Sequence, residues 1–237
     1  ATLLRLANGP TNTINSILIH ELRQAAAETA EAGKGLVLAG GEKFFSIGLD
    51  LPELLKLDRP AMQAFWKSFE DLQLELFCLP VPTASAIAGH ATAGGLILSL
   101  CTDLRFVASG RKLMGLNELQ IGIMVPWLTH LMLEHRVGAA KAYGIESSGA
   151  FMGPEEAKTA GLADEVLAPE ELEARATVRV SKLAQLPRQA FMGSKDNWAG
   201  GVRERFLSLR KQNDEALLES WFSLRTQGLL AEAAKKF

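Results

Sequence analysis

The segment Ala88-Gly89-His90-Ala91-Thr92-Ala93-Gly94-Gly95 decides how this chain is expected to fold. A short apolar strand, Thr83 to Ile87, leads into it, and a helix is expected to start at its end. The glycines allow the backbone to turn tightly and to approach a ligand closely. A second such turn, Phe45-Ser46-Ile47-Gly48-Leu49-Asp50-Leu51, follows another buried strand. Either turn alone is typical of an ordinary strand-to-helix junction, whereas the pair favours a ligand site.

Strand and helix signals alternate on both sides of these turns. Short, continuous apolar runs predict strands that are covered on both faces, as in a parallel sheet. These runs are residues 36–39, 83–87, 104–108 and 165–167. Apolar residues at helical spacing predict a core-facing helix from Pro60 to Phe77, and the chain from Pro169 onward is mostly helical in character. This order predicts an α/β fold with right-handed crossovers.

The charge of the chain is nearly balanced. With 25 basic and 27 acidic residues the formal net charge is -2, so no overall field would collect nucleic acid or an anionic membrane. The apolar runs are too short to span a bilayer. The two cysteines, Cys78 and Cys101, lie in apolar stretches and are expected to be reduced and buried. A small-molecule partner is therefore expected, with no nucleic acid and no membrane.

Common catalytic motifs do not occur in the sequence. There is no His-Glu-x-x-His helix and no Gly-x-Ser-x-Gly elbow, and the four histidines are scattered without metal-ligand spacing. The second turn has the glycine spacing of a phosphate loop, but Gly95 stands where that loop requires lysine. We expect no metal and no nucleotide hydrolysis.

The two turns resemble those of the crotonase, or enoyl-CoA hydratase/isomerase, family. Residues 45–51 are similar to the family's Phe-Ser-Ala-Gly-x-Asp-Leu turn, and residues 88–95 to its Asn-Gly-x-Ala-x-Gly-Gly-Gly turn. Ala88 replaces the asparagine and Ala93 replaces the first of the three glycines. Residues 101–105, Cys-Thr-Asp-Leu-Arg, resemble the family's Cys-Asp-x-Arg segment.

This resemblance implies an α/β, crotonase-like ββα-superhelix core over residues 1–170. A helical C-terminal region over residues 171–237 would then serve oligomerisation or cover an active site. The resemblance also implies a homotrimer or a dimer of trimers. The N-terminal residues lack the layout of a signal peptide, so we expect the cytoplasm for a bacterial protein, and the mitochondrial matrix or a peroxisome for a eukaryotic one.

The site residues follow from the same resemblance. The backbone N–H groups of Leu49 and Gly94 would form an oxyanion hole for a thioester carbonyl. Glu118, within Gly115-Leu116-Asn117-Glu118, matches the carboxylate of the family's monofunctional isomerases, and Ile97 stands where hydratases carry a second carboxylate. A surface or helix-capping carboxylate is the alternative for Glu118. The expected substrate-binding residues are Ser46, Ile47, Gly48, Ile97 and Trp127.

A single base implies a particular reaction, the shift of a 3-enoyl-CoA double bond to 2-enoyl-CoA in fatty acid β-oxidation. One carboxylate can remove a proton from C2 and return it to C4. The substrate is an acyl-CoA thioester, and no cofactor is expected. One alternative is an enoyl-CoA hydratase or another CoA-thioester enzyme of the same fold. Another is a non-catalytic acyl-CoA-binding protein.

Overall fold

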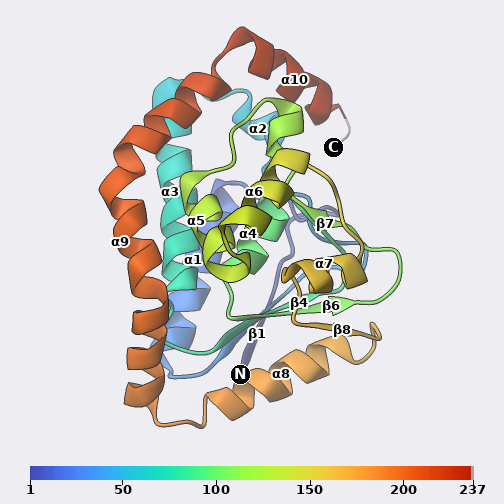
Figure 1. Cartoon of the computed structure of the whole chain (residues 1–237), viewed down its shortest axis with the longest axis vertical. Coiled ribbons are helices and arrows are strands. Elements are labelled where there is room, and N and C mark those ends of the chain that lie inside the picture. The colour runs from blue at the N-terminus through green and yellow to red at the C-terminus, as the bar shows by residue number, and fades with distance from the viewer. Residues whose placement is uncertain (236–237) are drawn as a thin grey trace.

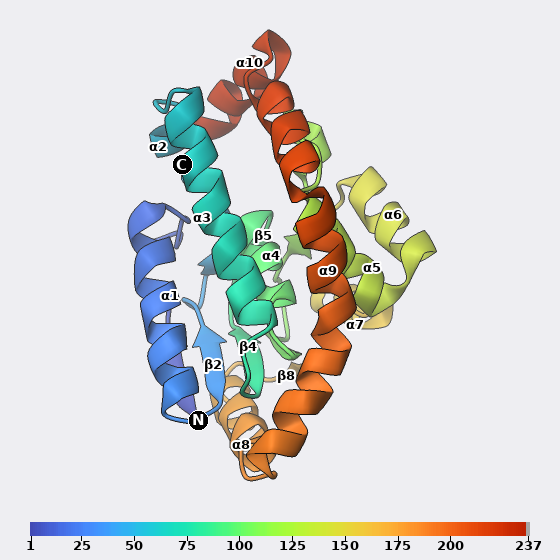
Figure 2. The same ribbon diagram turned by 90° about the vertical axis from the view of Figure 1, so that its left-hand side faces the viewer.

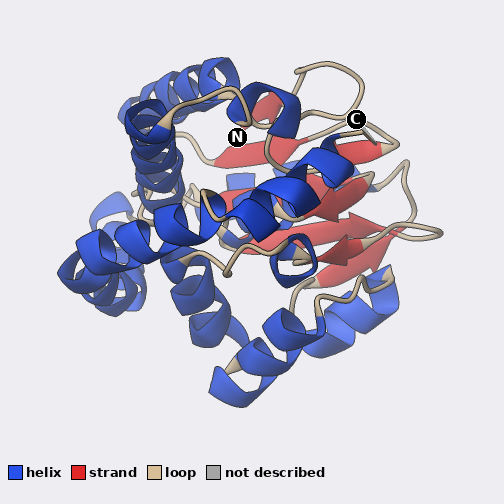
Figure 3. Ribbon diagram, turned by 90° about the horizontal axis from the view of Figure 1, so that it is seen from above, coloured by secondary structure: helices blue, strands red, loops and turns tan. Residues whose placement is uncertain are grey.

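The computed structural model describes residues 1–235, and its strands form two parallel sheets (Figure 1). The larger sheet has the strand order β1-β2-β4-β6-β8, and the smaller one has the order β3-β5-β7. Figure 3 shows helices on either side of the strands. The strands are β1 (Thr2–Arg5), β2 (Leu36–Ala39), β3 (Phe44–Ser46), β4 (Thr83–Ile87), β5 (His90–Thr92), β6 (Leu104–Ala108), β7 (Met114–Gly115) and β8 (Glu165–Leu167).

A strand-strand-helix unit is repeated along the chain. Strand β2 is followed by β3 and the short helix α2 (Leu51–Leu54), and β4 is followed by β5 and α4 (Gly94–Leu100). Strand β6 is followed by β7 and the 3-10 helix η1 (Glu118–Ile121). Because the second strand of each unit joins the smaller sheet, the chain segments that follow these strands emerge close together.

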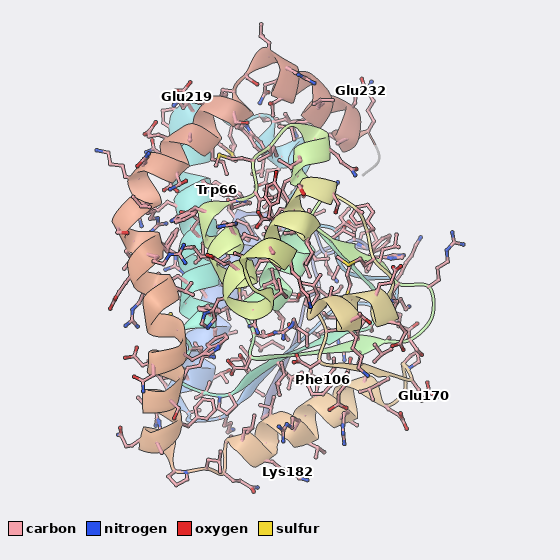
Figure 4. The ribbon with its side chains drawn as sticks, in the orientation of Figure 1. Trp66, Phe106, Glu170, Lys182, Glu219 and Glu232 are labelled. Atoms are coloured by element: carbon pink, nitrogen blue, oxygen red, sulfur yellow. The ribbon has the colours of Figure 1, made fainter. Side chains whose placement is uncertain are left out.

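The two faces of the larger sheet bury different helices. Strand residues alternate between the faces, so Val37 and Phe106 pack with α8 (Leu172–Leu183), whereas Leu36 and Leu38 enter the main core. Figure 4 labels Phe106 on the side toward α8. The main core also receives α1 (Ser16–Glu31) and α3 (Arg59–Phe77), whose N-termini are capped by Asn15 and Asp58. The strands and helices expected from the sequence are thus confirmed.

The C-terminal helices extend over the core. Helix α9 (Arg188–Trp221) packs along α3 and α5 (Trp127–Val137), and α10 (Leu224–Ala234) crosses the end of the molecule next to α2 and η1 (Figures 1 and 2). The remaining helices are α6 (Ala139–Ser148) and α7 (Pro154–Ala160). Within the described residues, no helix combines the length and the apolar character needed to cross a membrane.

The expected division at residue 170 does not coincide with a gap in packing. Helix α8 follows that residue, yet it packs on β2, β4 and β6 as part of the core. The reason is that its apolar residues Leu172, Ala176 and Val180 fall on one face and cover the open side of the sheet. The layer that covers the site begins later, with α9.

Candidate active site

The two glycine turns lie directly against each other. A Cβ on Gly48 would sit 2.9 Å from the backbone nitrogen of Gly94, and a Cβ on Gly94 would sit 3.0 Å from the Cα of Gly48. A Cβ on Gly95 would lie 2.0 Å from the carbonyl oxygen of Ser46. Gly48 also has a φ of 102°, a conformation that other residues rarely adopt. Glycine is needed here because the two backbones touch.

Two backbone N–H groups point out of this contact. Leu49 pairs with Ile14 in an isolated parallel bridge, whose bonds use the N–H groups of Ile14 and Asp50, so the Leu49 N–H is directed to the opposite side of its chain. Gly94 is the first residue of α4, where an N–H has no partner within the helix. Within residues 1–235 neither N–H donates to an acceptor. A Cβ on Gly94 would lie 3.4 Å from the Leu49 nitrogen, so the two unbonded N–H groups belong to backbone segments that lie next to each other.

Ala93 precedes the second donor in an unusual conformation. Its φ is 49° and its ψ is -124°, a region in which glycine is the ordinary residue. A non-glycine residue held there stores about 1–3 kcal/mol of strain. Alanine thus follows the backbone path that the family's glycine suits, and it adds a methyl group to the wall of the neighbouring cavity.

Two polar residues of the first turn shape it from within. Ser46 is fully buried, and its hydroxyl accepts a hydrogen bond from the Gly48 N–H at 3.1 Å. The Asp50 carboxylate caps α2 by accepting from the Glu53 N–H, and it also accepts from the Thr13 hydroxyl at 3.0 Å. Ser46 and Gly48 were expected to bind substrate. In the structure they hold the turn, and the cavity is lined by their neighbours Ile47 and Leu49.

A cavity of about 580 Å³ opens beside the two donors. Its size is in the range of small-molecule sites, about 300–1,000 Å³. Leu49 and Gly94 lie in its wall together with the expected residues Ile47 and Ile97. Trp66 and Phe69 of α3 belong to the main core and also add aromatic surface to the cavity. The walls are predominantly apolar and suit an acyl chain.

Glu118 is a buried carboxylate in the wall of this cavity. It is the first residue of η1, and its side chain is only 6% exposed. Its Oε2 atom has no hydrogen-bond partner among the described residues. Burial, reinforced by the negative charge of Glu146, raises the pKa of Glu118 to about 7. A carboxylate in this state can both take up and release a proton near neutral pH.

A second carboxylate lies behind Glu118 and outside the cavity. The carboxylate of Glu146, on α6, lies beside the His130 ring. The Nδ1 atom of His130 is 3.0 Å from one carboxylate oxygen and 3.1 Å from the other. Burial raises the pKa of Glu146, and His130 opposes that rise. No sequence motif indicates this pair, because two residues of two different helices meet only after folding. It adjusts the electrostatics of Glu118 and does not reach the donors.

The structure places the ring of Trp127 against His130 and Arg205. The Trp127 ring stacks on His130 with 5.5 Å between the two centroids, and the Arg205 guanidinium lies 5.9 Å from the centroid of the Trp127 ring. Within the described residues the cavity is lined by the preceding Pro126 and not by Trp127. The reason is that α5 begins at Trp127 and turns this side chain toward α9, where its Nε1 atom lies 3.5 Å from the Arg205 carbonyl.

The roof of the cavity comes from the C-terminal helices. Trp221 at the end of α9, with Leu229 and Ala233 of α10, completes the lining, and Glu232 stands at the edge in an ion pair with Lys235. Figure 4 labels Trp66 inside the molecule and Glu232 on α10 at its upper margin. The sequence predicts helices in this region, and the family resemblance implies that they serve oligomerisation or cover an active site; in the structure α9 and α10 supply residues that line the cavity.

Comparison with known proteins matches nearly the whole chain to one family. The sequence model of the family described as enoyl-CoA hydratase/isomerase matches residues 2–236. Among the described residues, no group of three or more His, Cys, Asp or Glu side chains is placed to hold a metal ion.

Individual relatives carry two different names. The human protein named enoyl-CoA delta isomerase 1, mitochondrial, is 29% identical over 192 residues, which are 79% of this chain and 64% of the relative, just under two thirds of its length. The protein named probable enoyl-CoA hydratase EchA17, from Mycobacterium avium, is 30% identical over 195 residues, which are 81% of this chain and 76% of the relative.

Solved structures agree with the fold. The crystal structure of human mitochondrial delta3-delta2-enoyl-CoA isomerase has a TM-score of 0.94 at 25% identity, and the match covers 99% of this chain and 92% of that one. An enoyl-CoA hydratase from Bacillus halodurans has a TM-score of 0.88 at 20% identity, over 97% and 95% of the two chains. The crotonase-like fold expected from the sequence is confirmed.

Proposed function

The chain belongs to the enoyl-CoA hydratase/isomerase family, and from that premise we propose that it is an isomerase that converts 3-enoyl-CoA to 2-enoyl-CoA with Glu118 as its base. One observation carries the proposal: the Oε2 atom of Glu118 has no hydrogen-bond partner among the described residues, and Glu118 lines the same cavity as Leu49, Gly94 and the apolar Ile97. By the resemblance to the family, Ile97 corresponds to the position of a hydratase's second carboxylate.

The proposed reaction moves one proton and one double bond. The Glu118 carboxylate takes a proton from C2, and the electrons of that C–H bond enter the thioester carbonyl to form an enolate. The N–H groups of Leu49 and Gly94 bind the enolate oxygen, and each such donor typically contributes about 3–4 kcal/mol to the transition state. When the carbonyl reforms, a C2=C3 bond is made, and the electrons of the former C3=C4 bond take the proton from Glu118 at C4.

Ile97 favours isomerisation over hydration. It is 2% exposed and borders the same cavity as Glu118. Hydration requires a water molecule that is held and polarised, which polar partners normally do. An apolar side chain gives water no such partner, and it keeps the surroundings of Glu118 dry, so that the pKa of Glu118 stays raised. Glu232, the other carboxylate beside the cavity, is exposed and paired with Lys235.

Two alternative functions can be tested in the same assay as the isomerase. Relatives with hydratase names keep hydration, or another reaction of CoA thioesters, as the alternative within the family. A non-catalytic acyl-CoA-binding protein is the alternative of another class. The experiment is to incubate the purified protein with 3-enoyl-CoA and, separately, with 2-enoyl-CoA, and to follow the products by mass and by absorbance.

Each function predicts a distinct outcome of that experiment. An isomerase converts 3-enoyl-CoA to 2-enoyl-CoA much faster than it adds water to 2-enoyl-CoA. Equal or faster hydration would transfer the assignment to hydratase. Binding of both thioesters without turnover, unchanged in Glu118→Gln, would identify a binding protein.

The assembly is a separate proposal. From the resemblance to the family we propose a homotrimer or a dimer of trimers. Each subunit would close its own cavity, because α10 packs on α2 and η1 of its own chain. Sedimentation at micromolar concentration should give a mass three or six times that of the 25.6 kDa chain, and a stable monomer would contradict the proposal.

A further inference from the structure

Two hydroxyl groups at the turn between α9 and α10 donate to one backbone carbonyl, and a third donates to one of the two. The hydroxyls of Ser220 and Thr226 both donate to the carbonyl oxygen of Gly122, each at 3.0 Å. The Ser223 hydroxyl donates to the Thr226 hydroxyl at 2.9 Å. Thr226 is 4% exposed. We call Ser220, Ser223 and Thr226 the hydroxyl cluster. Such connected hydrogen bonds strengthen one another in a buried setting.

Gly122 connects this cluster to the segment that carries Glu118. It ends η1 with a φ of 80°, and its N–H is directed back to the carbonyls of Glu118 and Leu119. The next residue, Ile123, also donates its N–H to the Glu118 carbonyl at 3.0 Å. Gly122 thus bonds through its N–H to the segment that carries the proposed base, and through its carbonyl to two members of the hydroxyl cluster.

The contact between η1 and α10 is tight at Gly122, and the φ of 80° there further disfavours any other residue. A Cβ there would lie 3.0 Å from the Leu229 Cδ1 atom and 3.0 Å from the Thr226 Oγ1 atom. Leu229 itself lines the cavity. The hydroxyl cluster therefore sets the distance between the base segment and the cavity roof.

The roof determines how dry the cavity is. Helix α10 packs on α2 at one side and on η1 at the other, and it brings Leu229 and Ala233 over the cavity next to Trp221. A carboxylate keeps a raised pKa only while water is kept away from it. Loosening of the roof should consequently change both the position of Glu118 and its affinity for protons.

We propose that the hydroxyl cluster holds α10 against Gly122, and that Ser220 and Thr226 are thereby positioning residues for the reaction of Glu118. This inference rests on the proposed isomerase function. It adds residues that do not touch the substrate but act through Gly122 on both the base and the roof.

Other charged groups near Glu118 stay unchanged in the test. Glu146, paired with His130, faces it from α6 and α5, and Glu232, paired with Lys235, stands on α10 at the edge of the cavity. A change at Thr226 removes none of these charges, and Glu232, which moves with α10, is exposed and paired with Lys235, so its effect on Glu118 is screened by solvent. A shift in the pH dependence would thus report mainly on the access of water to Glu118.

The test compares Thr226→Val, which removes the hydroxyl and keeps the shape, with Thr226→Ser, which keeps the hydroxyl. Thr29→Val is the matched control, since Thr29 is also 4% exposed and donates its hydroxyl to a backbone carbonyl, that of Ala25, within α1. The readouts are kcat, KM, the acidic limb of the rate profile against pH, and hydrogen exchange of residues 117–123 and 224–234.

Thr226→Val should lower kcat about fivefold to tenfold, the loss expected for one buried hydrogen bond. Its acidic limb should move to lower pH by about half a unit or more as water reaches Glu118. Exchange should accelerate in both segments together, and Thr226→Ser should restore most of each effect. Thr29→Val should lower thermal stability and leave the acidic limb in place.

Two results would overturn the inference. One is a Thr226→Val protein whose kcat and acidic limb equal those of the wild type, and the other is faster exchange in residues 224–234 without any change in residues 117–123. If Thr226→Val does not fold, Ser220→Ala takes its place in the same comparison. A wild type that leaves 3-enoyl-CoA unchanged would refute the proposed function itself, and the exchange data would then decide alone whether the cluster couples the two segments.

Discussion

Glu118 and Glu70 are two buried carboxylates in different parts of the molecule. Glu70 lies on α3 against α9 and is 1% exposed, and Glu118 is 6% exposed. Burial raises the pKa of both side chains. Glu70 accepts a hydrogen bond from the Arg210 Nε atom at 3.0 Å, and the charge of Asp214 raises its pKa further. Glu118 has an unpaired oxygen and borders a cavity.

The difference shows that a raised pKa by itself does not identify a catalytic base. Glu70 belongs to a closed network between two helices, where no substrate can reach its carboxylate. Glu118 faces a space that can hold a substrate, with two N–H donors in the same wall. Access, free hydrogen-bonding capacity and nearby donors separate the two residues, and the predictions below test that separation.

The largest expected effect is the loss of turnover in Glu118→Gln. The amide keeps the shape of the side chain but cannot accept the C2 proton, so kcat should fall about 10²–10⁴-fold, while binding of a CoA thioester stays close to that of the wild type. Glu70→Gln is the matched control and should keep kcat within about twofold of the wild type. If both variants lost the same activity, global damage would explain the loss, and the distinction between the two carboxylates would fail.

Glu118→Gln should lose activity but gain stability. The folded pKa is about 7 and the ordinary value is 4.5, so between these values the folded chain binds more protons, and the free energy of unfolding of the wild type falls as pH rises through that window. Glutamine carries no charge to bury. Urea unfolding should therefore show the variant more stable than the wild type by about 2–3 kcal/mol at pH 8, with most of that gain gone at pH 5. A gain that does not depend on pH would contradict this account.

The smallest expected effect is a new, weak activity in Ile97→Glu. A carboxylate beside Glu118 could hold and polarise water, so slow hydration of 2-enoyl-CoA should appear. Stability should fall by several kcal/mol, roughly the cost of burying a charge next to a like charge. Ile97→Leu is the control, since it keeps the site apolar and should stay within about 1.5 kcal/mol of the wild type. Hydration by the wild type as fast as its isomerisation would show that Ile97 does not set the reaction.

Local sequence predicted the floor of the cavity well. The turns around Gly48 and Gly94 have their own glycine spacing, and Glu118 lies in a segment with recognisable neighbours. The strands β2, β4 and β6 were visible as apolar runs. The short strands β3, β5 and β7 were not visible, because β3 and β5 overlap the two glycine turns and β7 has only two residues, too few for a periodic signal. The repeated strand-strand-helix unit therefore became apparent only in the fold.

Long-range contacts could not be predicted in this way. The position of Trp221 and Leu229 over the cavity depends on how α9 and α10 return to the core. The helical character of the chain after Pro169 did not indicate that α8 covers the larger sheet. Trp127 was assigned to the substrate from its closeness in sequence to Glu118, although the start of α5 turns its ring toward α9.

The most direct test of the central claim is the dependence of kcat/KM on pH for wild-type isomerisation of 3-enoyl-CoA. Glu118 must be deprotonated to act as the base, and its pKa is raised to about 7 by burial. The account predicts an acidic limb with a midpoint near neutral pH, below which the rate falls about tenfold per pH unit. A rate that stays constant down to about pH 5, close to the ordinary range of a solvated carboxylate, would contradict the assignment of this buried, unpaired carboxylate as the base.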